Sequence, residues 1–313
     1  MKNHILLFGY TGLIGNQIYK HIKQENYDKI FCFTRKKITP PTNKTNIISY
    51  TDIHTDLEQK LEDILQKNEA KWTIFLFTGE TIFGLINTQK WQNIYKTRID
   101  INKKVILILE KLNIEVSKIF SASAIGIYYL SPHQEVTENT EPPDNIVSNL
   151  VKDWENTILN SKYINKSVIM RLGAVLDKNS KIYQSLSLPS LISTGINFTP
   201  NSFFPWIYNK EIPLIIEYLM KIDFNGILNT VCDNYITYRE FLENFITIRS
   251  FLKKSFIIDI PKKILEKSLA ILMPRYYELI YSLFCSPKVI PQNLINLGYK
   301  FKFNNIKDVI KAM

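Results

Sequence analysis

The sequence predicts an α/β protein with a doubly wound parallel sheet and a smaller C-terminal substrate lobe. Short apolar runs alternate with amphipathic helical segments as far as residue 176, which is typical of parallel strands joined by crossover helices. Three glycines, spaced three residues apart, follow the first apolar run. The 313 residues suffice for one large domain with an appendage. The expected architecture is therefore Rossmann-like.

The first unit is a strand, a glycine turn, a helix and a second strand. "HILLFGY" at 4–10 is a continuous apolar run, which suits a central strand buried on both faces. Apolar Ile18, Tyr19 and Ile22 then recur among polar residues, so a helix follows. "DKIFCFTRK" at 28–36 predicts a second buried strand that ends in basic residues. Together these segments form a βαβ unit.

The alternation continues along the chain. Helices are expected at about 56–68, 91–112 and 146–159, and strands at 72–79, 118–126 and 166–176, with a polar loop over 131–145. From about residue 181 the pattern loosens. There we expect a strand at 224–231, a helix opened by Thr237, and a strand followed by a helix within 255–272.

The glycine turn indicates dinucleotide binding. In such a turn Gly9 permits the tight bend, Gly12 lets the backbone approach a pyrophosphate, and Gly15 lets the helix pack closely on the strand. The helix begins at about Leu13, so its free amides and positive dipole end point at the phosphates. The alternative is a glycine-rich turn without a ligand. The buried strand before the turn and the helix after it favour the dinucleotide.

The end of the second strand predicts which nicotinamide cofactor binds. An acidic residue there would bond the 2′-hydroxyl of NAD. This sequence instead has Thr34, Arg35 and Lys36, which offer a hydroxyl and cations to a 2′-phosphate. We therefore expect NADP(H), the alternative being a solvated basic turn.

Composition argues against several other classes of protein. The net charge is +10, but only six of the 39 basic residues are arginine and the lysines are scattered, so no nucleic-acid partner is expected. Cys32, Cys232 and Cys285 lack metal-ligand spacing, which predicts no metal site and a reduced, cytoplasmic protein. Without an apolar run of about 20 residues, and with an N-terminus that reads as a strand, no membrane association is expected.

Several motifs taken together resemble a known family. They are "GYTGLIG", "FTR", "FTGE", "SASAIGIYY", "SNLVKDWE", "RLGAVL", "FFPWIY" and "KVIPQNLINLGYKF", in this order along nearly the whole chain. The chain resembles the extended short-chain dehydrogenase/reductases, and within them an atypical epimerase-like family with a C-terminal module of unknown function. The resemblance implies a NAD(P)-binding domain over 1–235 and a C-terminal lobe over 236–313, with the module at about 255–303.

The resemblance also implies roles for individual residues. At the pyrophosphate it adds Thr11, Leu13 and Ile14 to the glycines as cofactor-binding residues, and at the adenosine phosphate it adds Arg35. Beside the ribose and nicotinamide it implies Thr78, Gly79 and Glu80, which follow a strand, and Arg98 on the next helix. Ser121 and Ser123 match the serines after the strand that follows, with Ser121 as a further cofactor-binding residue. The family usually has an asparagine followed by Ala-Gly-Glu after this strand. This chain departs from that pattern, with Leu76 and Thr78 around the site. It departs again at Tyr208 and Glu211, where the family has histidine and aspartate.

The usual acid/base pair of short-chain reductases is absent. Those enzymes use a tyrosine and a lysine four residues apart on one helix face. The one match to Tyr-x-x-x-Lys, Tyr19 with Lys23, lies in the helix after the glycine turn and is interpreted as chance. In the helix "IVSNLVKDWENTIL" the two expected positions hold Val147 and Val151, neither of which can transfer a proton.

Other side chains are weighed as substitutes. Ser123 can polarise a carbonyl and Tyr128 offers a phenol, so both are catalytic candidates, with polar pocket walls as the alternative. Lys152 lies one residue past the lysine position and is expected to point away from the site. His133 is interpreted as solvated rather than catalytic.

Aromatic residues are mostly assigned to packing. Trp91 and Trp154 are expected in the core. The resemblance places Phe204, Pro205 and Trp206 beside the substrate pocket, with core packing as the alternative. The aromatic stretch 273–284 has helical spacing and predicts an interior or self-association face, which leaves a homodimer open.

The sequence as a whole predicts an NADP(H)-binding protein that acts on a small-molecule substrate. Its expected reaction is hydride transfer to or from a carbonyl or sugar-like compound, with the nicotinamide carrying the redox chemistry. A catalytically inactive NADP(H) sensor or scaffold is the main alternative, because the tyrosine and lysine are missing. A sugar-nucleotide epimerase is a third, and it requires a proton relay that the sequence does not reveal.

Overall fold

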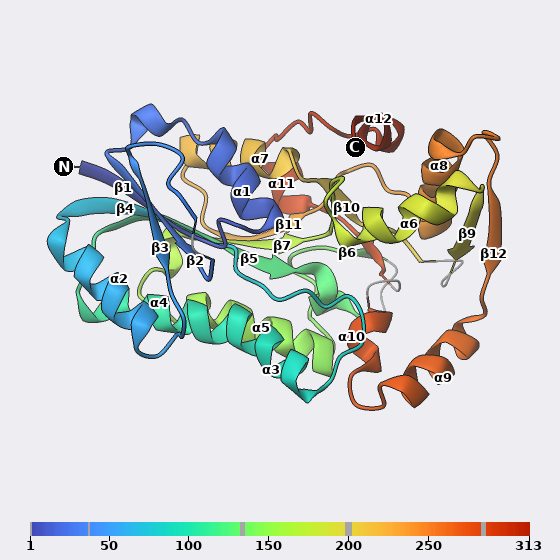
Figure 1. The fold of residues 1–313 in the computed structure, drawn as a ribbon, viewed down its shortest axis with the longest axis horizontal. Coiled ribbons are helices and arrows are strands. Elements are labelled where there is room, and N and C mark those ends of the chain that lie inside the picture. Colours follow the sequence, from blue (N-terminus) through green and yellow to red (C-terminus); the bar gives the residue numbers. More distant parts are fainter. Residues whose placement is uncertain (1, 37, 132–134, 198–201, 283–285) are drawn as a thin grey trace.

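The structure of the protein is a computed structural model that describes residues 2–36, 38–131, 135–197, 202–282 and 286–313. Its centre is a seven-stranded sheet in the order β11-β7-β5-β4-β1-β2-β3, in which each neighbouring pair is parallel (Figure 1). The strands are β1 Lys2–Phe8, β2 Lys29–Thr34, β3 Thr45–Ser49, β4 Ala70–Leu76, β5 Val116–Ala124, β7 Ser167–Leu172 and β11 Gly226–Thr230. The predicted doubly wound parallel sheet is confirmed.

Helices cover both faces of the sheet (Figure 1). On one face lie α2 Asp56–Lys67, α4 Ile101–Lys111 and α5 Ile146–Leu159, and on the other α1 Leu13–His21, α7 Glu211–Lys221 and α11 Gln292–Asn296. The fourth-residue spacing of Leu57, Leu61 and Leu65 puts all three on the buried face of α2, against strands whose side chains are buried on both sides. The continuous apolar runs in the sequence reflect this double coverage.

The glycine turn joins β1 to α1 where the strand order reverses, between β1 and β4. Gly9 has a φ of +87°, a left-handed conformation that glycine adopts at little cost, and a Cβ there would overlap the carbonyl of Phe77. A Cβ on Gly15 would overlap the carbonyl of Gly9. The predicted close packing of α1 on β1 at Gly15 is therefore confirmed.

The helix expected at 91–112 contains a π-turn. It runs as α3 Thr88–Tyr95, a π-helical turn Lys96–Asp100, and α4. The Thr97 hydroxyl donates to the carbonyl of Asn93 at 2.7 Å, which helps to satisfy the widened turn. Such turns are frequent at functional sites, and this one carries Arg98.

The single strand expected at 166–176 is wrong, because the chain breaks at Gly173. β7 ends at Leu172, and β8 Ala174–Leu176 leaves the main sheet to pair with β10 Trp206–Tyr208. A Cβ on Gly173 would lie 2.6 Å from the carbonyl oxygen of Pro205, so only glycine lets the two segments come this close. The break directs the chain toward the C-terminal half.

The C-terminal half is built from short helices and small sheets (Figure 1). Before residue 235 it contains α6 Lys181–Leu191 and β9 Thr194–Asn197. After that residue come α8 Tyr238–Arg249, β12 Phe256–Asp259, α9 Lys262–Leu272, α10 Tyr277–Tyr281, β13 Lys288–Val289 and α12 Ile306–Ala312. Thr237 caps α8 in a reciprocal hydrogen-bonded box with Glu240, as the sequence predicts. β13 pairs with β6 Glu135–Val136, so this strand pair joins segments from both sides of the expected domain boundary at 235. The boundary itself stays a prediction. His133 lies outside the described residues.

The close approach at the glycine turn yields a stability prediction. Gly15→Ala should lower the free energy of unfolding by about 1–3 kcal/mol, because the new methyl group overlaps the Gly9 carbonyl. The steric cost of the overlap exceeds the roughly 1 kcal/mol by which alanine stabilises a helix relative to glycine, so the net effect is destabilising. Gly79→Ala is the control, since its Cβ would make an ordinary 3.4 Å contact with Arg98. Equal urea midpoints for the two variants would contradict the packing described here.

Candidate functional site

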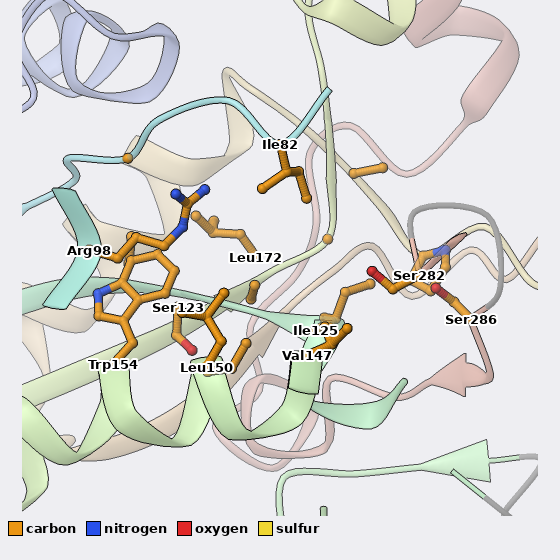
Figure 2. A pocket seen from close by; sticks show the side chains of 18 of the residues that line it. Ile82, Arg98, Ser123, Ile125, Val147, Leu150, Trp154, Leu172, Ser282 and Ser286 are labelled. Atoms are coloured by element: carbon orange, nitrogen blue, oxygen red, sulfur yellow. The ribbon is translucent and has the colours of Figure 1, made fainter. Parts of the chain in front are cut away.

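A cavity of about 390 Å³ opens at the carboxyl ends of the central strands, and we call it the inner cavity (Figure 2). Its walls include Gly12, Leu13 and Ile14 from the glycine turn, Phe77, Thr78 and Gly79 after β4, Arg98, Ser123 of β5, Val147, Leu150, Val151 and Trp154 of α5, and Phe204 and Tyr238 from beyond the main sheet. Ligands of open α/β sheets bind at this edge, where the strand order reverses.

The structure separates the predicted cofactor residues into three groups. Gly12, Leu13, Ile14, Thr78, Gly79 and Arg98 line the inner cavity. Gly9 and Gly15 shape the turn from within, and Thr11, Thr34, Arg35 and Glu80 gather near the end of β2. Ser121 does not line the cavity, because its buried hydroxyl accepts a hydrogen bond from the Asn102 amide at 3.2 Å.

The end of β2 forms an open polar corner. The hydroxyls of Thr11 and Thr34 are 3.4 Å apart, and a guanidinium nitrogen of Arg35 lies 3.8 Å from a carboxylate oxygen of Glu80. The Arg35 side chain is 60% exposed, so this ion pair is weak and can exchange for another anion. The Arg35 cation and the Thr11 hydroxyl are thus exposed beside the glycine turn, with the buried Thr34 behind them.

Arg98 is the one charged side chain among the described residues that line the inner cavity. Its guanidinium carbon lies 5.4 Å from the centre of the Trp154 ring (Figure 2). Burial lowers the pKa of Arg98 to about 10, and the charge of Glu80 opposes that shift. Arg98 therefore stays a cation at neutral pH and gives the cavity a fixed positive charge.

The absence of a tyrosine–lysine pair on α5 is visible in the cavity wall. Val147 and Val151 both line the inner cavity, where the acid/base pair was sought. Lys152 points away, as predicted, and donates to the backbone carbonyls of Pro142 and Pro143 at 3.2 and 3.4 Å. The wall formed by α5 is therefore apolar at both positions.

A buried ion pair lies between α5 and β7. Arg171 donates from Nε and Nη2 to the two carboxylate oxygens of Glu155, both at 2.8 Å. Burial alone would lower the pKa of Arg171, but the hydrogen bonds and charge of Glu155 raise it overall. Both groups are thus charged, in a bidentate geometry of the strong kind.

Ser123 is bound to this ion pair. Its hydroxyl donates to Glu155 at 2.5 Å, and in Figure 2 the oxygen points toward α5. A hydroxyl has one proton to donate and a carboxylate can only accept, so that proton is already used. The geometry therefore disfavours Ser123 as the donor that polarises a substrate carbonyl.

Tyr128 is held on the other side of Arg171. Its hydroxyl accepts from the Arg171 guanidinium at 2.6 Å and lies 2.9 Å from the carbonyl of Thr137 and from the side-chain oxygen of Asn229. Burial raises the pKa of Tyr128, although Arg171 opposes the shift. Tyr128 does not line the inner cavity. Its phenol is part of the buried network and is not directed at a substrate.

Two aromatic residues in the cavity wall were not identified as site residues from the sequence. Trp154, expected in the core, is 6% exposed, yet its ring lines the cavity, and its indole N–H has no hydrogen-bond partner among the described residues. Tyr238 follows the Thr237 cap and lines the cavity from α8. Its distance from the glycine turn in sequence leaves no local pattern that reveals it. The aromatic stretch expected inside does contribute buried Met273, Tyr276 and Leu279.

The comparisons with known proteins bear on this geometry. The model of the NAD-dependent epimerase/dehydratase family matches residues 5–172, which hold the glycine turn and β1 through β7. The chain belongs to this family. The match ends at the last residue of β7, one residue before the break at Gly173.

Three relatives extend the family likeness over the whole chain. The chain is 22% identical to the chloroplastic SDR39U1 homologue of Arabidopsis thaliana, over 97% of its own length and 85% of the relative's. It is 20% identical to the epimerase family protein YfhF of Bacillus subtilis, over 99% and 97%. A crystal structure of the human epimerase family protein SDR39U1 with NADPH has a TM-score of 0.76 at 19% identity, over 99% and 98%. The fold is shared across both halves.

Other kinds of site were sought in the described ranges. No group of three or more His, Cys, Asp or Glu side chains there is placed to hold a metal ion. None of the described helices combines the length and apolar character that crossing a membrane requires. Cys32 and Cys232 are free and buried, and burial raises the pKa of each thiol to about 12. Both thiols therefore stay protonated and unreactive at neutral pH.

The buried ion pair yields a prediction that needs no ligand. Glu155→Ala should lower the free energy of unfolding by about 3–5 kcal/mol, because it leaves Arg171 charged and unpaired in the interior. The double variant Glu155→Leu/Arg171→Met removes both charges and should be more stable than Glu155→Ala. Urea unfolding measures all three proteins. A double variant that is less stable than Glu155→Ala would show that the unpaired charge of Arg171 is not the main cause of the stability lost in Glu155→Ala.

Proposed function

We propose that the chain binds NADP(H) and transfers hydride between the nicotinamide and the carbonyl or alcohol carbon of a small molecule. The observation that carries this proposal is the inner cavity, which begins at the glycine turn and ends beyond the sheet, with Arg35 exposed at the adjoining end of β2. Family membership supports it, because the family is described as NAD-dependent. The human relative was crystallised with NADPH.

The residues at the turn fit a dinucleotide. The N-cap of α1 is Gly12, which has no side chain, so no side chain satisfies the first amides of the helix. These amides and the positive end of the helix dipole suit a pyrophosphate. Arg35 and Thr34 would bind the 2′-phosphate, and the nicotinamide would lie in the inner cavity against Val147 and Leu150.

The chain's own contribution would be binding, orientation and exclusion of water. The cofactor, when bound, supplies the hydride. Arg98 holds a positive charge in the cavity beside Gly79, and the apolar side chains of α5 keep water from the reacting carbon. Ser123 is fixed by Glu155, so in this account it supports the wall without exchanging a proton. We infer that the proton for the substrate oxygen comes from a water molecule at that oxygen, since the wall of α5 keeps water only from the reacting carbon.

The remaining expectations become part of this proposal. We propose that the lobe over 236–313 contributes to the substrate side, since Tyr238 of that lobe lines the cavity. We place the protein in the cytoplasm, as the two free thiols in the described part of the chain support. A homodimer stays a prediction.

A second candidate function is an NADP(H) sensor without turnover, favoured by Val147 and Val151 in the wall of the inner cavity. A single-turnover experiment separates the two. The NADPH complex is mixed with a panel of aldehydes and ketones, and the absorbance of NADPH is followed. Oxidation that depends on the added carbonyl supports the reductase. Tight NADPH binding without oxidation by any compound supports the sensor.

Arg35 yields a prediction on cofactor choice. Arg35→Ala should weaken NADPH binding about tenfold or more, because a charge-assisted hydrogen bond contributes about 1.5–3 kcal/mol. NADH, which lacks the 2′-phosphate, should bind equally to both proteins. Lys36→Ala is the matched control for loss of one neighbouring cation, and it should have a smaller effect. Calorimetric titration measures each pair, and equal loss of NADPH and NADH affinity would remove the assigned role of Arg35.

Ser123 yields a prediction on turnover. In the hydride-transfer assay Ser123→Ala should keep the rate within about threefold, whereas a general acid contributes about 10²–10⁴-fold. The reason is that the Ser123 proton is donated to Glu155. The matched variant Tyr128→Phe should behave in the same way, since Tyr128 does not line the cavity. A loss of a hundredfold in either protein, with NADPH binding intact, would restore that residue as a catalytic candidate.

A further inference from the structure

A second and larger cavity adjoins the inner one, on the side of the C-terminal half. It measures about 800 Å³ and shares with the inner cavity the wall residues Leu13, Ile82, Gly173, Ala174, Phe204 and Tyr238. We call it the lobe cavity. Ile82, which points into the inner cavity in Figure 2, lines both spaces. A ligand in the lobe cavity would reach the place proposed for the nicotinamide.

The wall of the lobe cavity is mainly apolar. Its large side chains are Ile82, Phe83, Val175, Ile182, Leu186 and Ile196. Lys181 is the one charged side chain among the described residues of this wall, and it is exposed and bonded to Gln184 at 3.2 Å. The diphosphate of a sugar nucleotide would require cations, which bind phosphate oxygens strongly. The described wall does not provide a cluster of them.

Three of the hydroxyl groups in this wall are hydrogen-bonded within the chain. Ser185 donates to the carbonyl of Ile182 at 2.9 Å, and Thr194 donates to that of Ile192 at 3.3 Å. Ser180 accepts from the amide of Tyr183 at 3.3 Å, as the cap of α6. The hydroxyls of a sugar would be desolvated here with few partners, which is unfavourable. An apolar body would instead gain roughly 25 cal/mol for each Å² that it buries.

We propose that the substrate is an apolar ketone or aldehyde, or the matching alcohol, whose hydrocarbon body fills the lobe cavity while its carbonyl reaches the inner cavity. This inference rests on the proposed hydride transfer. In the reducing direction the carbonyl carbon accepts a hydride from NADPH and the oxygen takes one proton from water, so that the alcohol, NADP⁺ and a hydroxide ion, which the solvent buffer neutralises, are released. The described residues of the lobe cavity include no cluster of phosphate-binding cations, so a sugar nucleotide is not expected to bind there.

The edge of the lobe cavity offers a matched pair of variants. Ile196 of β9 belongs to its wall and is 41% exposed, so Ile196→Lys adds a charge at the rim without burying one. Its direct neighbour across the strand pair is Ile258 of β12, which is 59% exposed and not part of either cavity wall. Ile258→Lys is therefore a control with the same chemistry in the same small sheet.

The experiment is calorimetric titration of the NADP⁺ complex, which has no hydride to transfer to a ketone, with 2-decanone and, separately, with UDP-glucose. We expect 2-decanone to bind in roughly the micromolar range with a negative heat-capacity change, the mark of apolar burial. Ile196→Lys should weaken that binding about tenfold, and Ile258→Lys should leave it unchanged. In its separate titration, UDP-glucose should show no binding.

Two results would overturn this inference. One is tighter binding of UDP-glucose than of 2-decanone, and the other is an equal effect of the two lysine variants on ketone binding. Failure of the proposed function is recognised separately. If the protein does not bind NADPH at all, the cofactor proposal fails, whereas NADPH binding with no affinity for the ketone defeats the substrate class alone.

Discussion

The ion pair between Arg171 and Glu155 determines the chemistry that the site can perform. It is buried between β7 and α5, and it has taken up the hydroxyls of Ser123 and Tyr128, the two groups that could otherwise serve the missing acid/base pair. A buried charge must be paired and hydrogen-bonded, so these contacts cannot be released for catalysis without a large loss of stability. The carboxyl edge of the sheet is thus rigid and closed to proton exchange at these positions.

The inner cavity and the lobe cavity next to this network differ in the polarity of their walls. The inner cavity has a cation, Arg98, and a glycine turn with free amides, which suit a charged nucleotide. The lobe cavity has a mainly apolar wall, in which the hydroxyls of Ser185 and Thr194 donate to backbone carbonyls. The proposed cofactor would therefore meet polar backbone and charge, while a substrate would meet hydrocarbon. Hydride transfer needs little more than close placement of the two reacting carbons.

Much of the fold could be predicted from the sequence because the signals are local. The apolar run before Gly9, the spacing to Gly15 and the Thr237 cap each depend on neighbouring residues, and each appears in the structure as expected. The break at Gly173 could not be predicted, because it depends on a carbonyl of Pro205 that approaches from a distant segment. A continuous apolar pattern gives no sign of such an approach.

The site was less predictable than the fold, for the same reason. The residues of the glycine turn that line the inner cavity were identified from a local motif. Tyr238 and the wall of the lobe cavity come from segments with no repeating pattern, so only their packing reveals them. The surroundings of Ser123 and Tyr128 could not be predicted, because a sequence does not show that Arg171 and Glu155 lie beside them, and the catalytic role of either residue stays a prediction.

The most direct measurement is a crystal structure of the protein with NADPH. The account predicts the pyrophosphate at the first turn of α1, the 2′-phosphate within hydrogen-bond distance of Arg35, and the nicotinamide in the inner cavity between Val147 and Ile82, with one face open to the lobe cavity. A nicotinamide outside the inner cavity, or one whose reacting carbon faces Ser123 or Tyr128 freed from Arg171 and Glu155, would contradict it.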